Sequence, residues 1–167
     1  MTSTSSGWPR RAGLLLTTSA LAAWASGLLF LGAVVAPHVF FHSGLDRTQA
    51  GAVMAPVFLA FDRWIVVFLG GALLGELLRL TNARRAGARL AVHLALLAAL
   101  AGTAVAGSFF TSPGIEELRR QGAHRGEGPA GLKLDALHHR AEELGRAQVL
   151  LCAAVLASCW TWPRARA

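Results

Sequence analysis

The sequence predicts an all-α integral membrane protein, folded as a bundle of four transmembrane helices. Of the 167 residues, 54% are hydrophobic and only 15% are charged, and the mean hydropathy is positive, which is unlike an ordinary soluble domain. Four separate segments are apolar over about the 20 residues that a helix needs to cross the hydrocarbon core of a bilayer. A helix also satisfies its own backbone hydrogen bonds, which lipid cannot do for it.

The four apolar segments set the order of the elements. We expect spans at about 13–36, 52–78, 87–110 and 144–162, within one domain of residues 13–163. Arg10 and Arg11 before the first run are also typical of a secretory signal, but the apolar core of a signal is only roughly 7–15 residues long. We therefore expect an uncleaved anchor. Residues 1–12 are expected to be a disordered cytoplasmic segment and residues 164–167 a cytoplasmic tail.

An extramembrane loop is expected over residues 111–143, between the third and fourth spans. Ser112 followed by Pro113 is typical of the start of a short helix. From about residue 131 onward, leucine and alanine recur at steps of three and four residues. This periodicity predicts an amphipathic helix that runs directly into the fourth span.

The distribution of Lys and Arg predicts that both termini are cytoplasmic. The terminal side holds eight of these cations and the opposite side seven, so the count alone decides little. The short loop TNARRAGAR decides the orientation, because its arginines lie close to two membrane ends. We expect the cytoplasmic (inner) membrane of a bacterium, with anionic lipid as the partner of these arginines. No basic stripe with interleaved aromatic residues is visible, so nucleic acid is not an expected partner.

Ionisable residues inside an apolar run predict a polar cluster near the outer interface. The stretch VFLAFDRWIVVFLGG, residues 57–71, places an acid and a base roughly 8 Å below that interface, at about 1.5 Å per residue. The start of the fourth helix, HHRAEELGR, brings further charges to the same level. We call these residues the outer polar cluster, and they are Asp62, Arg63, His138, His139, Glu142, Glu143 and Arg146.

The first interpretation of the outer polar cluster is a structural network. Adjacent residues do not face each other on a helix, so each member is expected to find its partner on another helix. Arg63 would pair with Glu142 or Glu143, and Asp62 with Arg146 or a histidine. The helices would then be held in register.

The second interpretation is a functional site, because ionisable groups inside a membrane are costly and often functional. The first span ends in APHVFFH, which brings His38 and His42 to the level of His138. With a carboxylate these histidines offer ligands for a metal or for haem, and a path for a proton or small molecule is a further alternative. No HExxH or CxxC motif is present, so we predict no cofactor from the sequence.

Other polar and small residues are expected to serve helix packing. Glu76 precedes Arg79 by three residues, a helix pair that can snorkel to the cytoplasmic interface, and His93 lies at the same level. The step GALLG, residues 71–75, permits a close approach of two helices within the chain. Cys152 and Cys159 are two helical turns apart, too far to bridge each other, and are expected to be buried thiols.

Four segments resemble a known family in their order and spacing. They are SGLLFLGAVVAPHVFF, AGAVMAPVFLAFDRW, FFTSPGIEELR and LHHRAEELGRAQVLL, and they extend from Gly27 to about Leu151. The chain resembles the transmembrane-protein-205-like family, a group of small four-helix membrane proteins of undetermined activity. The residues that match the family pattern are Gly27, Phe30, Ala36, Pro37, Phe40, Ala50, Gly51, Phe58, Asp62, Pro113, Ile115, Leu137 and His138. The family usually has a serine three residues after that histidine, where this chain has Ala141.

Taken together, these features predict a multi-pass membrane protein of structural or accessory type rather than an enzyme. No nucleophile with a positioned base and no phosphate-binding loop is visible in the sequence. The bilayer is the expected surrounding, and a second copy or a membrane complex the expected partner. The alternative is a protein that binds or transports a metal, haem or small molecule at the outer polar cluster.

Overall fold

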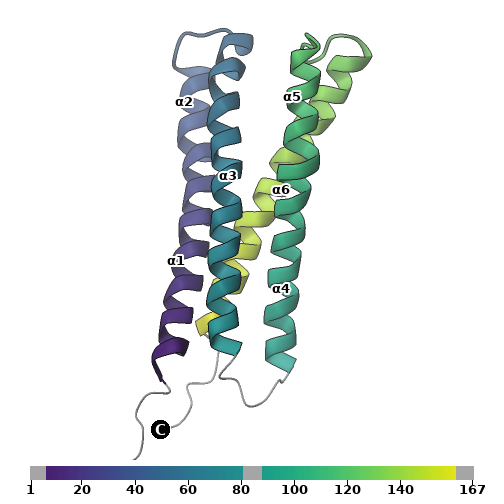
Figure 1. The fold of residues 1–167 in the computed structure, drawn as a ribbon. Coiled ribbons are helices and arrows are strands. Elements are labelled where there is room, and N and C mark those ends of the chain that lie inside the picture. Colours follow the sequence, from purple (N-terminus) through teal and green to yellow (C-terminus); the bar gives the residue numbers. More distant parts are fainter. Residues whose placement is uncertain (1–6, 81–87, 161–167) are drawn as a thin grey trace, which may run out of the picture.

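The computed structural model describes residues 7–80 and 88–160, and these residues form four helical rods without any strand (Figure 1). The first rod consists of α1 (Trp8–Phe30), a π-helical turn η2 (Leu31–Val35) and α2 (Ala36–Phe41). The second rod is α3 (Arg47–Leu80). The third consists of α4 (Ala88–Val105), a π-helical turn η3 (Ala106–Thr111) and α5 (Ser112–Arg120), and the fourth is α6 (Gly128–Trp160). The predicted all-helical architecture is confirmed for this part of the chain.

Three of the rods are long and apolar enough to cross a membrane. They cover Trp8–Phe41, Arg47–Leu80 and Leu90–Arg120. Only 11%, 11% and 22% of their most apolar windows are buried inside the protein, so much apolar surface is left uncovered. Lipid is the solvent that accepts such a surface, whereas water disfavours large contiguous apolar patches. The rod α6 is not among these three, and a fourth crossing by residues 144–162 stays a prediction.

Two of the rods continue through a proline at which the predicted span ended. Pro37 and Pro113 each follow shortly after a π-helical turn, η2 and η3 respectively. A wider turn spares the hydrogen bond that proline cannot donate and relieves the clash of its ring with the preceding turn. In η3, the hydroxyl of Thr111 donates to the carbonyl of Ala106 at 3.0 Å. The short helix expected at Ser112 and Pro113 is present as α5, but it continues the third rod to Arg120 instead of standing apart in a loop.

The rods pack as a bundle in which α1 lies along α3 and α6 crosses from α5 to the start of α1 (Figure 1). The start of α1, the end of α3, the start of α4 and the end of α6 share one end of the bundle, which we call the N-terminal end. The predicted cytoplasmic arginines at 84, 85, 164 and 166 lie outside the described residues. The side of the membrane on which the N-terminal end lies stays a prediction.

The core between the rods combines apolar side chains with a buried polar link near its middle. Trp24 is fully buried, and its indole N–H donates to Oε1 of Gln148 at 3.2 Å. The amide of Gln148 donates in turn to the carbonyl of Thr103, also at 3.2 Å. This link joins α1, α6 and α4. Cys152 is buried beside it, and Cys159 is buried nearer the N-terminal end, both as free thiols, as expected.

Glycines bring α1 and α3 into backbone contact near the N-terminal end. A Cβ atom on Gly75 would lie 2.4 Å from Oγ1 of Thr17 and 2.6 Å from the carbonyl of Gly13. A Cβ atom on Gly13 would lie 2.5 Å from the carbonyl of Gly75. Only glycine fits at either position, so the small-residue step in α3 is used for packing within the chain. The same contact places Glu76, the next residue, against α1.

Candidate functional site

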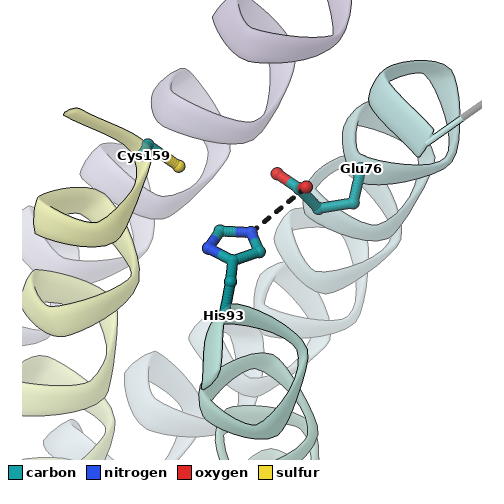
Figure 2. Close-up of side chains that lie close together, drawn as sticks. All are labelled: Glu76, His93 and Cys159. Carbon is teal, nitrogen blue, oxygen red and sulfur yellow. Dashed lines mark ion pairs between the residues drawn. The ribbon is translucent and has the colours of Figure 1, made fainter. Parts of the chain in front are cut away.

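A buried carboxylate lies at the centre of the N-terminal end. Glu76 is on α3, four residues or about 6 Å before the helix ends, and only 3% of it is exposed. Thr17 on α1 donates its hydroxyl to Oε1 at 3.1 Å, and Nη1 of Arg79 donates to the same oxygen. The other oxygen, Oε2, lies 3.1 Å from Nε2 of His93 on α4 (Figure 2). Three rods therefore meet at one side chain.

The fourth rod joins this carboxylate through its partners. Nη1 of Arg79 also donates to Sγ of Cys159 on α6, at 3.3 Å. Nδ1 of His93 lies 2.6 Å from Oγ of Ser158, whose hydroxyl donates to the carbonyl of Val155 at 2.6 Å. His93 therefore directs Nδ1 at Ser158 and Nε2 at Glu76. We call these residues the Glu76 network: Thr17, Glu76, Arg79, His93, Ser158 and Cys159.

The electrostatics of the Glu76 network explain how the charges tolerate burial. Arg79 is 8% exposed and His93 is fully buried. A lone charge at such a depth is strongly disfavoured, but an opposite charge in direct contact and several hydrogen bonds offset much of that cost. The expectation that the pair reaches out to the interface is wrong, because the close approach of α1 at Gly75 covers both side chains.

The same network places three kinds of metal-ligand atom together. A carboxylate oxygen of Glu76, an imidazole nitrogen of His93 and the sulfur of Cys159 all lie within 4.8 Å of one another (Figure 2). Each comes from a different helix. Among the described residues, no comparable group includes His38, His42 or His138. The rings of His38 and His42 instead stack on each other at the exposed end of α2, with 5.7 Å between their centroids.

The outer polar cluster does not form the predicted pairs. Arg63 is exposed, and among the described residues it forms no ion pair with Glu142 or Glu143. Glu142 lies 3.9 Å from Arg146 and Glu143 lies 3.3 Å from His139, in both cases one turn away on α6 itself. These residues project from an exposed face of α6, so their charges remain in contact with solvent or headgroups.

Asp62 has a partner on another helix, although not the expected one. Ser112, at the start of α5, donates its hydroxyl to Oδ2 of Asp62 at 2.5 Å. The serine therefore joins α3 to the third rod and does not cap a helix. Farther along, Arg119 of α5 donates to the backbone carbonyl of Gly51 on α3 at 3.2 Å. These two hydrogen bonds connect α3 to α5 in the half of the bundle away from the N-terminal end.

His138 is the one histidine of the outer polar cluster that turns inward. The residue is half-buried, and its Nε2 atom is buried with no hydrogen-bond partner among the described residues. Burial, followed by the positive charges of Arg125 and Arg119, lowers the pKa of His138 from its ordinary 6.5 to about 4, against the attraction of Asp135. Asp135 itself pairs with Arg125, which lowers the pKa of that carboxyl. His138 is therefore neutral throughout the physiological range.

The depressed pKa of His138 predicts a loss of stability in mild acid. The unfolded chain takes up a proton at this histidine as the pH falls through about 6.5, while the folded chain stays neutral down to about pH 4. The contribution of the neutral His138 ring to the unfolding free energy is complete above pH 6.5 and is lost as the pH falls from 6.5 to 4. Because the ring is only half-buried, we expect about 1–2 kcal/mol, well below the full linkage value.

Unfolding in detergent at several pH values measures this effect. The difference in unfolding free energy between the original chain and His138→Gln should change by that amount between pH 7 and pH 4. His139→Gln is the matched control, because the ring of His139, the next residue, is exposed. The same pH dependence in both variants would contradict the assignment to His138.

Sequence reasoning missed Thr17, Ser158 and Cys159 as members of the Glu76 network. None of the three is charged, and small polar residues are common in membrane helices. A signal was nevertheless present. Measured along their predicted spans, Thr17, Glu76, His93 and Cys159 all lie within about two helical turns of the same membrane face. A search for polar residues of equal depth would have grouped them.

Comparison with known proteins gives one family match. Residues 19–124 match the family described as a domain of unknown function, DUF4149. This range covers most of the first rod and all of α3, α4 and α5, and so includes Glu76, Arg79 and His93 but not Cys159. No curated protein and no solved structure gives a significant match. The description names no activity, and the resemblance to the transmembrane-protein-205-like family stays a prediction.

Proposed function

The chain belongs to the DUF4149 family of unknown function, and from this premise we propose that it is a non-enzymatic accessory membrane protein whose helices are fastened together by the Glu76 network. One observation carries the proposal. A single buried carboxylate has partners on α1, α3 and α4, and its network extends to α6. A contact that joins all four rods at one level fixes their relative rotation and depth.

The physics of helix association in lipid supports this role. Lipid tails are as apolar as leucine, so apolar contacts alone give membrane helices little drive to associate. Close packing at small residues and hydrogen bonds between helices must supply it. Both occur together where Gly13 and Gly75 touch and Thr17 reaches Glu76. The link from Trp24 through Gln148 to Thr103 adds a second fixed point.

We further propose that α6 provides a fourth crossing and that both termini are cytoplasmic, in a bacterial inner membrane. The buried residues Cys152, Val155 and Cys159 on α6 and its position beside α1 support the crossing. The shared end of α1 and α6 supports termini on one side (Figure 1). The outward apolar surface leaves room for a second copy or for a partner in a membrane complex. Membership of the transmembrane-protein-205-like family is the finer assignment that fits this arrangement.

The alternative function is binding of a metal, haem or small molecule at the outer polar cluster. One observation favours it, namely the buried Nε2 atom of His138 with no hydrogen-bond partner among the described residues. His38 and His42 contribute little to such a site, because both are exposed at the end of α2 and stack on each other. A site there would therefore rest on His138 alone, and we rank this function second.

Replacing the buried charges by apolar side chains, first one and then both, tests the accessory role. Glu76→Met alone is expected to lower the unfolding free energy by about 3–5 kcal/mol, because it leaves the Arg79 charge without its carboxylate. Adding Arg79→Met should restore most of the loss, because apolar residues of similar volume can replace a buried ion pair at little cost. Chemical or thermal unfolding of the purified variants measures both effects.

The cellular readout separates a structural role from a chemical one. For a structural network, the effect of the gene in cells should follow the amount of folded protein, which size-exclusion chromatography and immunoblotting measure. A double variant that is folded and abundant but behaves like a deletion would contradict the accessory role. That result would indicate that the ionisable groups themselves perform chemistry.

A further inference from the structure

The ligand atoms of Glu76, His93 and Cys159 are nearly at the spacing of a metal site. Oε2 of Glu76 and Nε2 of His93 lie 3.1 Å apart, and the sulfur of Cys159 lies within 4.8 Å of one carboxylate oxygen and one ring nitrogen of these two residues. In a tetrahedral zinc site with bonds of about 2.0–2.3 Å, neighbouring ligand atoms are about 3.3–3.8 Å apart. A shift of about 1 Å by the cysteine side chain would bring all three into range.

The imidazole of His93 is oriented as in a metal ligand. Nδ1 is held by Ser158, which itself donates to the carbonyl of Val155. Metal-binding histidines almost always donate their second ring nitrogen to such a partner, because this fixes both the tautomer and the direction of the ring. Nε2 then faces a carboxylate oxygen at 3.1 Å (Figure 2). A proton on Nε2 joins these two atoms in the Glu76 network, and a metal ion that replaces the proton would be bound by both.

A cation already lies between the other two ligand residues. The guanidinium of Arg79 donates both to Oε1 of Glu76 and to Sγ of Cys159. The carboxylate and the sulfur are thus arranged around positive charge. Arg79 is buried against α1, but it is the penultimate residue of α3. To exchange the guanidinium for another cation, its hydrogen bonds to Glu76 and Cys159 must break and the long side chain must rotate toward the end of the helix.

The charge balance of this exchange identifies the cation. With Arg79 in place, one positive guanidinium and one carboxylate sum to zero, while the thiol and the imidazole are neutral. With a divalent ion in place, its two charges are balanced by the carboxylate of Glu76 and a thiolate of Cys159. The metal–sulfur bond forms as the sulfur–hydrogen bond breaks, and the proton goes to water. Both states are neutral, as a buried site in lipid requires.

We propose that Glu76, His93 and Cys159 form a binding site for a divalent transition-metal ion of the zinc type, which enters by displacing Arg79. A donor set of one oxygen, one nitrogen and one sulfur suits zinc or cobalt, whereas magnesium and calcium prefer oxygen ligands alone. All three residues lie within about two helical turns of the N-terminal end, so the ion has a short path from water. The inference rests on the proposed function, because its three ligands belong to the Glu76 network.

Cobalt titration of the full-length chain tests the site. The protein is purified without a histidine tag, stripped with a chelator and titrated with Co²⁺, which reports thiolate ligation by a near-ultraviolet charge-transfer band and tetrahedral geometry by visible bands. We expect saturation at about one ion per chain. Cys159→Ser should abolish the charge-transfer band. Cys152→Ser is the matched control, a buried cysteine two turns away on the same helix, and should keep it.

A second variant tests the displacement of Arg79. Arg79→Gln removes the competing cation and should strengthen Co²⁺ binding by at least about tenfold. Because one proton leaves per ion bound, the affinity of the original chain should also rise about tenfold per pH unit while the thiol is protonated. Weaker binding by Arg79→Gln, or binding that does not depend on pH, would overturn the exchange.

The outcomes separate this inference from the proposed function. If neither the original chain nor Arg79→Gln gives a charge-transfer band, the metal site is wrong, and the stability results for Glu76 and Arg79 still decide the fastening role. A band that survives Cys159→Ser or disappears in Cys152→Ser places the ion elsewhere and also overturns the site. If the original chain gives the band and the Glu76 variant loses stability, both proposals are upheld.

Discussion

Glu76→Gln is expected to lower the unfolding free energy by about 3–5 kcal/mol, as much as Glu76→Met. Glutamine keeps the shape of the side chain and its oxygen can still accept from Thr17, so the change removes little more than the negative charge. What remains is the buried guanidinium of Arg79, which is only 8% exposed, without the carboxylate that neutralises it. A buried charge that has lost its counter-charge is far more costly than an exposed one.

Reversible unfolding in mixed micelles measures this loss. Glu143→Gln is the matched control, because it removes the same charge from an exposed side chain, one that lies 3.3 Å from His139. Surface pairs contribute little, so the control should change the free energy by less than about 1 kcal/mol. Equal effects of the two substitutions would show that the Glu76 network contributes no more than a surface pair.

Gly75→Ala is expected to cost about 1–3 kcal/mol or more, through a clash rather than a lost charge. The added methyl group would lie 2.4 Å from Oγ1 of Thr17 and 2.6 Å from the carbonyl of Gly13. The second neighbour is backbone and cannot rotate away, so α1 must move off α3. That movement would also break the hydrogen bond between Thr17 and Glu76.

The control for Gly75→Ala lies on the same helix. A Cβ atom on Gly70 would meet nothing within 4 Å. Gly70→Ala is therefore expected to be neutral or to stabilise α3 by up to about 1 kcal/mol, through the better helix propensity of alanine. Thermal unfolding of the two variants side by side measures the contrast. Similar melting temperatures would mean that α1 and α3 do not approach as closely as the structure has them.

The rods were predictable because their signal is long. A run of about 20 apolar residues leaves few alternatives to a helix in lipid, and single polar residues do not interrupt it. The ends of the rods were less predictable. Pro37 and Pro113 suggested boundaries, but a π-helical turn before each proline allows the helix to continue. Nothing in the local sequence LGAVV or AGSFFT indicates a π-helical turn.

The depth of the site residues along their helices was predictable, but the direction in which their side chains point was not. Counting residues from a membrane face placed Glu76 and His93 at one level, and the structure joins them. The same counting placed Arg63 level with Glu142 and Glu143, but α6 is rotated so that its acids face outward and pair along their own helix. The rotation of a helix depends on contacts such as Gly13 with Gly75, which involve residues far apart in the sequence.

The length of the rods has a consequence for how the protein meets bilayers of different thickness. The 34 residues of α3 extend over about 50 Å, whereas the hydrocarbon core is only about 30 Å thick. The charges of α5 and of the first turns of α6 suit water, so we expect this end of the bundle to project from the membrane. A thinner or thicker bilayer would then change the tilt of the rods and the length of the projecting part.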